Sequence, residues 1–460
     1  MYCYRTMKAR FRVTFAPSVT AEVADRSARG IAATVGRLIS SGELPVGTRL
    51  PTVRELSRDL GVSPTTVSEA WQSLASVGAI DARGRQGTFV RAPTGPSSPR
   101  RYRRVTEGPG HFALDLSTGT PDPALLPDLG PVIARVERHS LTSSYLDDPV
   151  LPELAQRVRA DWPFEPEELT VVDGAMDALD RVASVIVRLG DRVVVEHPAF
   201  PPLLDLLELL GAEVIGVDMD AEGMSPAGLE AALAQGATAV FLQPRAHNPT
   251  GITMSAARCE QLAGVLAGSR AIVVEDDHSG DIASGALVSI GHWLPARTVH
   301  VRSYSKSHGP DLRLAAVAGA GRVVTAVANR RLLGPGWSSR ILQAVLVEML
   351  DHPPTVAAVA AARAEYARRR GTVTAVLAAA GVGFTGTDGI NLWMQVADER
   401  SALLTLAAQG IGAAPGEPFM VRADRPSLRV TVGLIDRDID GYAHILADAA
   451  GNRPARSGQR

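Results

Sequence analysis

The sequence predicts an α/β protein of two parts: a small helical domain that ends in a β-hairpin, and a larger domain built from βαβ units. Residues 22–91 hold short helical patterns and end in a glycine-rich turn. From Ala113 onward, short apolar runs alternate with helical stretches, which is the pattern of an α/β sandwich. Between these parts, residues 92–112 are rich in proline, glycine, serine and arginine, a composition typical of a semi-stiff linker.

The length of 460 residues suits two or three domains of ~100–200 residues each. We expect five segments in this order: a disordered N-terminal extension at 1–21, the small helical domain at 22–91, the linker at 92–112, the larger domain at 113–452 and a tail at 453–460.

The composition excludes several classes of protein. A net charge of −2 gives no global attraction to nucleic acid, so any DNA contact has to be local. Two cysteines, Cys3 and Cys259, cannot build a disulfide framework, which fits a reducing cytoplasm. No apolar run approaches the ~18 residues of a membrane span, and the N-terminus lacks an apolar signal core. We therefore expect a cytoplasmic protein without a membrane segment, and we predict no metal site.

The first domain shows a helix-turn-helix pattern. Ile31–Ser40 is an amphipathic helix, and Thr52 with Glu55 forms a capping-box sequence at the start of a second helix. Gly61 makes the turn, and a third helix runs from the cap Ser63 to Leu74. This third helix would present its cap and the residues of its first turns to the major groove of DNA. Those residues are Ser63, Pro64, Thr65, Thr66 and Ser68.

Two short strands, Ala79–Asp81 and Gly87–Val90, flank a polar tip with Arg83, Arg85 and Gln86. This hairpin completes a winged helix, and the stretch LPVGTRLPTVRELSRDLGVSPTTVSEAWQSLASVGAIDARGRQGTFV resembles the DNA-binding domain of the GntR family. The resemblance implies that Arg49, Arg54, the start of the third helix and the wing contact double-stranded DNA. The third helix lacks the arginine or asparagine that many members carry at its start, so no base specificity is implied. A small helical protein-interaction domain is the alternative.

The larger domain contains segments that are apolar or β-branched throughout, as buried parallel strands are. The strand candidates are Leu169–Val172, Arg192–Glu196, Ala212–Val217, Thr238–Leu242, Ala271–Glu275 and Val299–Ser303. After Pro353, a helix at Thr355–Ala380 leads to Ile390–Val396 and Ser427–Val432, which predicts a smaller α+β lobe.

Lysine is almost absent from this chain: only Lys8 and Lys306 occur among 47 basic residues. Arginine can replace lysine wherever a positive charge suffices, but a guanidinium stays protonated and cannot attack a carbonyl. Lys306 directly follows a predicted strand, so it is a candidate for forming a Schiff base. The alternative is a chance survivor of an arginine-rich composition.

The sequence around Lys306 supplies the other groups that a pyridoxal 5'-phosphate (PLP) site needs. Asp276 could pair with the pyridine nitrogen, Phe200 could stack on the ring, and Asn248 could donate to the phenolic oxygen. All of these follow or end predicted strands, where open α/β sheets bind ligands. Taken singly, such residues are also common in turns, solvated loops and cores. The candidates for the phosphate cradle are Gly174, Ala175, Met176, Ser303 and Arg313.

Residues 115–450 resemble fold-type I aminotransferases, which are PLP-dependent transferases. Together the two parts resemble the MocR (GabR/PdxR-like) subfamily of GntR regulators. The resemblance implies that Tyr145 reaches the cofactor phosphate of the partner subunit and that Arg429 holds a substrate carboxylate; a surface arginine at a strand edge is the alternative for Arg429. His278 stands where the family usually has a tyrosine that hydrogen-bonds the phenolic oxygen.

The leading hypothesis is a PLP-dependent, DNA-binding transcriptional regulator that acts as a homodimer. Lys306 would hold PLP as an internal aldimine, and an amino compound or PLP itself would act as effector. A working aminotransferase would use the same residues with a 2-oxo acid as acceptor, and a third hypothesis is a sensor of PLP alone. The winged helix favours a regulator because an enzyme gains nothing obvious from one.

Overall fold

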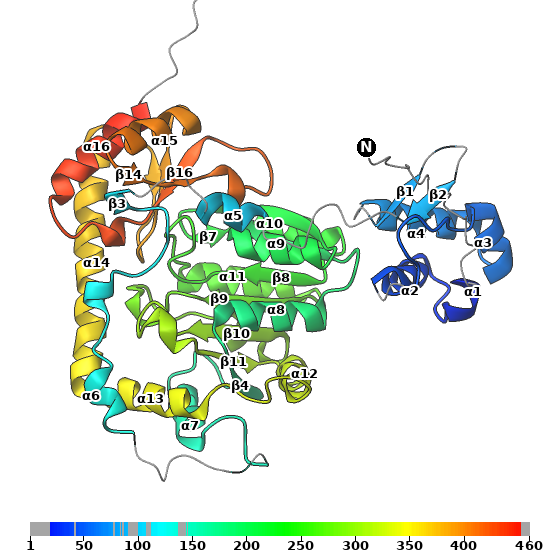
Figure 1. Cartoon of the computed structure of the whole chain (residues 1–460), viewed down its shortest axis with the longest axis horizontal. Coiled ribbons are helices and arrows are strands. Elements are labelled where there is room, and N and C mark those ends of the chain that lie inside the picture. Colours follow the sequence, from blue (N-terminus) through cyan, green and yellow to red (C-terminus); the bar gives the residue numbers. More distant parts are fainter. Residues whose placement is uncertain are drawn as a thin grey trace, which may run out of the picture. The chain divides into compact units, whose positions relative to one another are not determined.

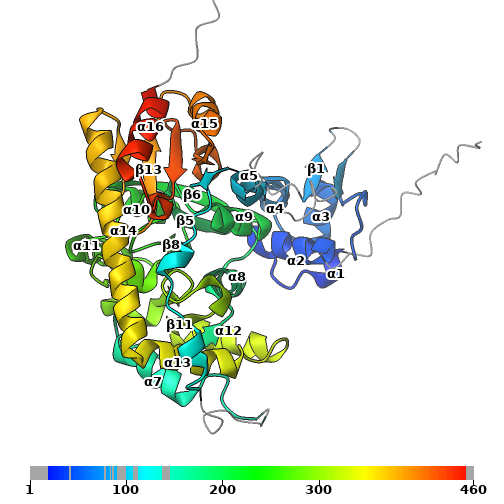
Figure 2. The ribbon, with the colours of Figure 1, turned by 60° about the vertical axis from the view of Figure 1, so that its left-hand side comes forward.

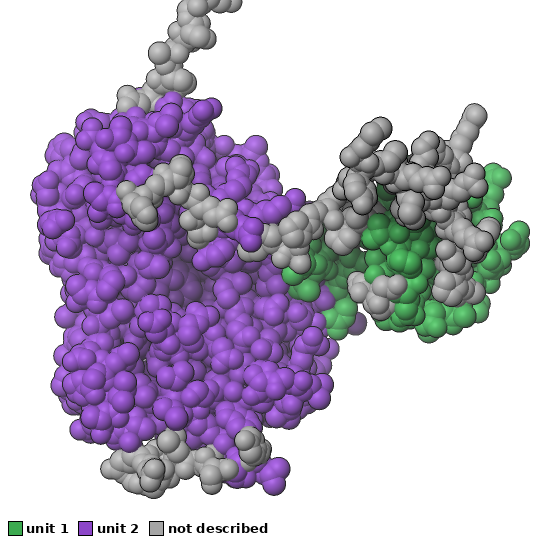
Figure 3. Space-filling view, in the orientation of Figure 1, with its two compact units in different colours: residues 1–98, 188–191, 208–213 green, residues 99–187, 192–207, 214–460 purple. Residues whose placement is uncertain are grey.

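A computed structural model describes residues 19–40, 43–76, 79–82, 84, 87–90, 100–106, 112–136, 144 and 146–451. The chain divides into two compact units, coloured separately in Figure 3. The smaller comprises residues 1–98 with 188–191 and 208–213, and the larger comprises 99–187, 192–207 and 214–460. Within the described ranges, no helix is both long and apolar enough to cross a membrane.

The smaller unit is a helical bundle with a β-hairpin. Its elements are α1 (Val19–Glu22), α2 (Ala28–Ser40), α3 (Val53–Leu60), α4 (Pro64–Ser76), β1 (Ile80–Ala82) and β2 (Thr88–Val90). The predicted helices and strands are confirmed to within a few residues. One difference lies at the N-terminus, where Val19 is buried in the core of this unit. The folded chain therefore begins before residue 22, because an apolar side chain there completes the core.

The capping box predicted at Thr52 is confirmed. Thr52 Oγ1 accepts the N–H of Glu55 at 3.2 Å, and Glu55 Oε2 accepts the N–H of Thr52 at 2.8 Å. Gly61 makes the turn before α4 with φ 69°. A third segment pairs with β2 of the hairpin, which was not predicted. Arg49 forms a β-bridge with Phe89, and the Leu50 N–H donates to the Thr88 carbonyl. The wing is thus fixed to the chain that precedes α3.

The larger unit is organised around an eight-stranded mixed sheet in the order β4-β11-β10-β9-β8-β5-β6-β7. The strands are β4 (Glu168–Val172), β5 (Arg192–His197), β6 (Glu213–Asp220), β7 (Gly223–Met224), β8 (Ala239–Leu242), β9 (Ile272–Asp277), β10 (Thr298–Ser303) and β11 (Ala315–Gly319). All six predicted strands are present, and β5, β8, β9 and β10 are parallel to one another. β11 was missed, and it is antiparallel to both β10 and β4. Its sequence, Ala-Ala-Val-Ala-Gly, has little β-branched character to mark a strand.

Helices pack against this sheet in the larger unit (Figure 1). They are α6 (Gly130–Ile133), α7 (Pro152–Ala160), α8 (Ala175–Ile186), α9 (Pro201–Leu209), α10 (Pro226–Ala234), α11 (Ala256–Ala267), α12 (Gly321–Leu332) and α13 (Arg340–Asp351). One apolar cluster joins β8 and β9 to α10 and α11, and a second joins β4 and β11 to α7 and α13. Buried apolar side chains thus hold the strand ends in fixed positions.

The C-terminal lobe is α+β, as predicted. Its elements are α14 (Pro353–Ala379), β12 (Phe384–Thr385), β13 (Leu392–Gln395), α15 (Glu399–Ala408), β14 (Ile411–Gly412), β15 (Ala414–Pro415), β16 (Ser427–Val430) and α16 (Ile439–Gly451). α14 is a long helix that runs beside α16 and along the larger unit (Figure 2). β14 pairs in parallel with β3 (Leu114–Asp115), which brings the start of the larger domain into this lobe.

Part of the predicted linker is helical. α5 (Arg100–Thr106) belongs to the larger unit, where the N–H groups of Arg101 and Tyr102 both donate to the carboxylate of Asp205 in α9. The proline- and arginine-rich composition of residues 92–112 predicted a linker and gave no indication of this helix. Asp205 supplies from a distant segment the acceptor that helical N–H groups need in the first turn.

Candidate cofactor-binding site

The candidate site lies at the carboxyl ends of β8, β9 and β10, which are neighbours in the sheet. Gln243 directly follows β8, Asp276 is the penultimate residue of β9, and Ser303 ends β10. His278 and Lys306 follow within three residues of the ends of β9 and β10. Parallel pairing therefore brings polar side chains that are far apart in sequence to one edge of the sheet.

Lys306 is half-buried, and its amine nitrogen lies 2.8 Å from Nδ1 of His278. Burial, together with the positive charge of Arg429, lowers the pKa of the Lys306 amine to about 8, although Asp276 opposes the shift. About a quarter of the Lys306 side chains are then uncharged amines at pH 7.5. A lysine of this kind is a nucleophile near neutral pH.

Asp276 is buried, and its two carboxylate oxygens differ. Oδ2 accepts a hydrogen bond from Gln243 Nε2 at 2.7 Å, whereas Oδ1 is buried without a hydrogen-bond partner. Burial raises the pKa of Asp276 to about 6, although the bond from Gln243 opposes the shift. A buried carboxylate oxygen without a donor calls for a charged N–H from a ligand, which a protonated pyridine ring supplies.

Gln243 was not predicted, although it stands at a strand end like the residues that were. Its side-chain carbonyl accepts the N–H of Asn248 at 2.7 Å, so its amide N–H₂ must face Asp276. Gln243 thus ties the Asn248 loop to the candidate ring-binding carboxylate. Phe200, which precedes α9, lines a small cavity together with Gln243 and Asp276.

Arg429 of β16 is buried, and one of its three nitrogens lacks a hydrogen-bond partner. Its Nη1 donates to Asn248 Oδ1 at 3.3 Å, Nη2 donates to the Ser117 carbonyl, and Nε has no hydrogen-bond partner. In the part of the chain that the structure describes, no carboxylate forms an ion pair with it. Burial lowers the pKa of Arg429 to about 10. A buried guanidinium with a free N–H fits the carboxylate of a ligand.

Two of the groups predicted to hold a phosphate, Gly174 and Arg313, lie together. Gly174 precedes α8 with φ 98°, and the first-turn N–H groups of α8, at Ala175 and Met176, have no acceptor within the helix. Arg313 Nη2 donates to the Asp173 carbonyl at 3.1 Å, and a Cβ on Gly174 would lie 2.9 Å from the same nitrogen. Ser303, at the end of β10, is also buried.

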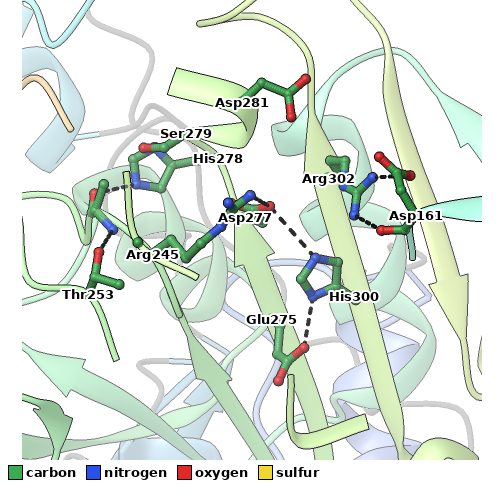
Figure 4. Close-up of polar contacts among 12 residues, drawn as sticks. Asp161, Arg245, Thr253, Glu275, Asp277, His278, Ser279, Asp281, His300 and Arg302 are labelled. Carbon is green, nitrogen blue, oxygen red and sulfur yellow. Dashed lines mark hydrogen bonds and ion pairs between the residues drawn. The ribbon is translucent and has the colours of Figure 1, made fainter. Parts of the chain in front are cut away.

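A buried ionic cluster on β9 and β10 was also missed (Figure 4). Arg245 pairs with Asp277 at 2.5 Å, and His300 lies between Glu275 at 2.8 Å and Asp277 at 3.8 Å. Burial alone would lower the pKa of His300, but the two neighbouring carboxylates outweigh it and raise that pKa. His300, inside the otherwise apolar start of β10, could have signalled this cluster, because buried charges require partners.

The small unit exposes most of the residues predicted to contact DNA. Arg49, Arg54, Ser63 and Thr65 are exposed, whereas Thr66 and Ser68 are half-buried. Ser63 Oγ accepts the N–H of Thr66 at 3.1 Å, so this serine caps α4. Four predicted residues lie outside the described residues: Arg83, Arg85 and Gln86 of the wing, and Tyr145.

Comparisons with known proteins match both parts of the chain. Residues 27–90 match the family of bacterial regulatory proteins of the gntR type, and residues 113–446 match aminotransferase class I and II. The vitamin B6 salvage pathway transcriptional repressor PtsJ of Salmonella typhimurium is 35% identical over 431 residues, covering 91% of this chain and 97% of PtsJ. The chain belongs to the MocR subfamily of GntR regulators.

A second transcriptional regulator and two solved aminotransferases also match most of the chain. The HTH-type transcriptional regulator TauR of Rhodobacter capsulatus is 29% identical, covering 83% of this chain and 87% of TauR. A kynurenine aminotransferase of Pyrococcus horikoshii, solved with PMP, matches with a TM-score of 0.69 at 22% identity, covering 78% of this chain and 95% of its own. LysN of Thermus thermophilus matches with a TM-score of 0.67 at 21% identity, and the match covers 75% of this chain and 94% of LysN. The larger unit of this MocR protein therefore has the fold of PLP-dependent transferases of type I.

Proposed function

We propose that this MocR protein is a transcriptional regulator that binds PLP at Lys306 and responds to an amino compound that carries a carboxylate. We assign DNA binding to residues 22–91 and cofactor binding to residues 113–452. The observation that carries the proposal is the unpartnered Oδ1 of Asp276 beside the reactive amine of Lys306. A buried carboxylate oxygen without a donor is costly unless a ligand supplies that donor.

Each residue then has a defined task. PLP, when bound, supplies an aldehyde carbon and an electron-withdrawing ring. Lys306 is the nucleophile for that carbon, and Asp276 holds a proton on the ring nitrogen. Gln243 keeps Asp276 oriented through its 2.7 Å hydrogen bond, and Phe200 covers the ring. The phosphate cradle is formed by Gly174, Ala175, Met176, Ser303 and Arg313, which combine helix N–H groups with a guanidinium.

Arg429 favours an amino acid, or a related amino compound with a carboxylate, over PLP alone as the effector. The guanidinium is buried, has a free Nε, and lies across the face of Phe419 at 5.2 Å. PLP has no need of this second anion site once its phosphate is held at α8. In a site that bound PLP alone, the buried guanidinium of Arg429 would therefore have no anionic partner.

The contacts of α5 favour a regulator over a working aminotransferase. Val105 of α5 packs in a buried cluster with Phe419, and Arg101 Nη1 donates to the Met420 carbonyl at 2.8 Å. The Phe419 carbonyl in turn accepts the N–H of Ala199, next to Phe200, at 2.8 Å. In the sequence, α5 is the first described helix after the winged helix. It packs against Phe419, and the guanidinium of Arg429 lies over the ring of Phe419.

A ligand on Arg429 changes the surroundings of Phe419, and α5 carries that change to the segment that leads to the winged helix. This coupling requires the ligand to prefer one arrangement of α5. We further propose that the protein is a cytoplasmic homodimer. The dimer binds two DNA half-sites, because winged helices of this kind bind paired sites.

The first test follows visible absorption of the full-length protein loaded with PLP while amino acids, and then 2-oxo acids, are added. The same samples are assayed for binding to a DNA duplex selected from a random-sequence pool. A spectral change that stops after one equivalent and alters DNA affinity supports the regulator. Continued conversion of amino acid to 2-oxo acid without any change in DNA affinity supports the aminotransferase instead.

A second test addresses α5. Val105→Ala removes two methyl groups from the cluster around Phe419, and Val356→Ala is its matched control because Val356 is 50% exposed on α14. We expect Val105→Ala to keep the spectral response to amino acids while the ligand-induced change in DNA affinity falls at least threefold. An unchanged DNA response in Val105→Ala would remove α5 from the mechanism.

A further inference from the structure

His278 carries its proton on the nitrogen that faces away from Lys306. Its Nε2 lies 3.1 Å from the Ala246 carbonyl, which can only accept a hydrogen bond, so Nε2 is the donor. Burial, followed by the charge of Lys306, lowers the pKa of His278 well below its ordinary value, so the ring holds a single proton near neutral pH. Nδ1 is then a lone pair, and it accepts from Lys306 at 2.8 Å.

The Ala246 carbonyl is fixed in this position by its own loop. The Ala246 N–H donates to Thr253 Oγ1 at 2.8 Å, and Thr253 Oγ1 donates to Asp388 Oδ2 at 2.8 Å (Figure 4 shows His278 and Thr253). Ala246 also has a positive φ of 45°, which an L-residue holds only when its surroundings enforce it. Turning the His278 ring over would lose the bonds at both nitrogens.

The charged groups around His278 favour the singly protonated ring. Lys306, in the loop after β10, and His247, in the loop after β8, both oppose a second proton. Asp277, at the end of β9, favours one, but Arg245 pairs with it at 2.5 Å and offsets its charge. Ser279 Oγ lies 3.4 Å from Nδ1, where its hydroxyl can only donate.

We propose that His278 presents a lone pair, and not a proton, to the cofactor beside Lys306, so that the Lys306 linkage keeps its proton to higher pH than a donor at this position would allow. The inference rests on the proposed attachment of PLP at Lys306. The phenolic oxygen of PLP is ortho to the ring position that carries the aldehyde, so a group that contacts Lys306 Nζ lies within reach of that oxygen.

The physical reason lies in which protonation state is stabilised. Loss of the proton from the linkage leaves an unshared negative charge on the phenolic oxygen. A hydrogen-bond donor stabilises that state and promotes the loss, whereas a lone pair repels it and delays the loss. A protonated linkage is the more electrophilic one, so His278 keeps the site ready to exchange with an amino compound over a wide range of pH.

The proton position is tested first on cofactor-free, full-length protein. Long-range ¹H–¹⁵N correlation spectra of histidine-labelled protein report which ring nitrogen carries hydrogen, and His278 is assigned by its disappearance in His278→Leu. We expect hydrogen on Nε2 alone at pH 7.5. Hydrogen on Nδ1, or on both nitrogens, would overturn the inference whether or not PLP binds.

The consequence is tested by titrating the visible band of the PLP-loaded protein with pH. The variants are His278→Tyr, which restores a donor, and His278→Leu, which neither donates nor accepts; His278→Phe serves if the leucine variant does not fold. Compared with the wild type, we expect the band of the tyrosine variant to titrate about one pH unit lower, and that of the leucine variant at the same or lower pH.

A leucine variant that titrates at higher pH than the wild type would mean that His278 donates, which contradicts the inference. A wild type that forms no visible band and no borohydride-stable adduct at Lys306 would instead refute the proposed function. The nitrogen spectra then still decide the protonation of His278, so the two failures are distinguishable.

Discussion

Asp276 and Asp277 are adjacent carboxylates, yet replacing each with asparagine should change stability in opposite directions. In the absence of cofactor, Asp276 is a buried charge that lacks a donor for Oδ1, whereas Asp277 is paired with Arg245 at 2.5 Å. Asparagine at position 276 keeps the bond from Gln243 through its own carbonyl and removes the charge. Asparagine at position 277 leaves the Arg245 guanidinium buried without its partner.

The magnitude for Asp276 follows from its pKa, which burial raises from 3.8 to about 6. Because the folded value is the higher one, ionisation of Asp276 costs stability, and the cost appears as pH rises above 3.8 and is complete above the folded value. At pH 7 the cost is at most about 3 kcal/mol, and at pH 5 it is about half of that. Asp276→Asn should recover this free energy in the cofactor-free protein.

Urea titration of cofactor-free, full-length protein, followed by tryptophan fluorescence, measures the effect at pH 7 and pH 5. We expect Asp276→Asn to be more stable than the wild type, with a gain that shrinks at pH 5, while its affinity for PLP falls at least tenfold because the ring nitrogen loses its partner. Asp277→Asn should lose about 3–5 kcal/mol. The reasoning fails if Asp276→Asn is no more stable than the wild type, or if its gain does not depend on pH.

Three further predictions concern other parts of the molecule. Covalent attachment of PLP should accelerate as pH rises, reach half of its maximal rate near pH 8 and level off about one pH unit higher, because the pKa of Lys306 is about 8; stopped-flow absorption measures this, and a rate that keeps rising steeply to pH 10 would show an ordinary lysine. Arg429→Lys should attach PLP normally but require at least tenfold more amino acid for its spectral change, because an ammonium cannot form the paired bonds of a guanidinium; equal titration midpoints would exclude Arg429 from ligand binding. Thr52→Ala should lower the stability of the small unit by about 1 kcal/mol and speed hydrogen exchange at the Glu55 N–H about fivefold, with Thr52→Ser as the control that keeps the cap; unchanged exchange would show that the capping box contributes nothing.

Much of the architecture could be predicted because it depends on local patterns. Apolar strand segments, the capping box at Thr52 and the glycine at position 61 each report a nearby physical requirement, and the structure has the corresponding elements. β11 escaped because four of its five residues are alanine or glycine, which mark a strand poorly in the sequence. α5 escaped because the acceptor for its N-terminus, Asp205, lies 104 residues away from Arg101 in the sequence.

The candidate site was partly predictable for a related reason. Lys306 and Asp276 could be selected because strand ends meet at one edge of a parallel sheet, so position along the chain implied proximity. The proton of His278 could not be placed in this way, because it is decided by the main-chain carbonyl of Ala246, which any residue would supply. The partner of Arg245 was equally hidden, since two buried charges meet only when β8 and β9 are side by side.

The scarcity of lysine has a practical consequence for chemistry in the cell and in the laboratory. PLP is an aldehyde, and aldehydes condense with exposed ε-amines on protein surfaces. Among the described residues, Lys306 is the sole ε-amine, and the surface cations are arginines, which form no such adducts. Within this part of the chain, reductive labelling therefore counts occupied sites directly, because Lys306 is the one ε-amine that can hold PLP covalently.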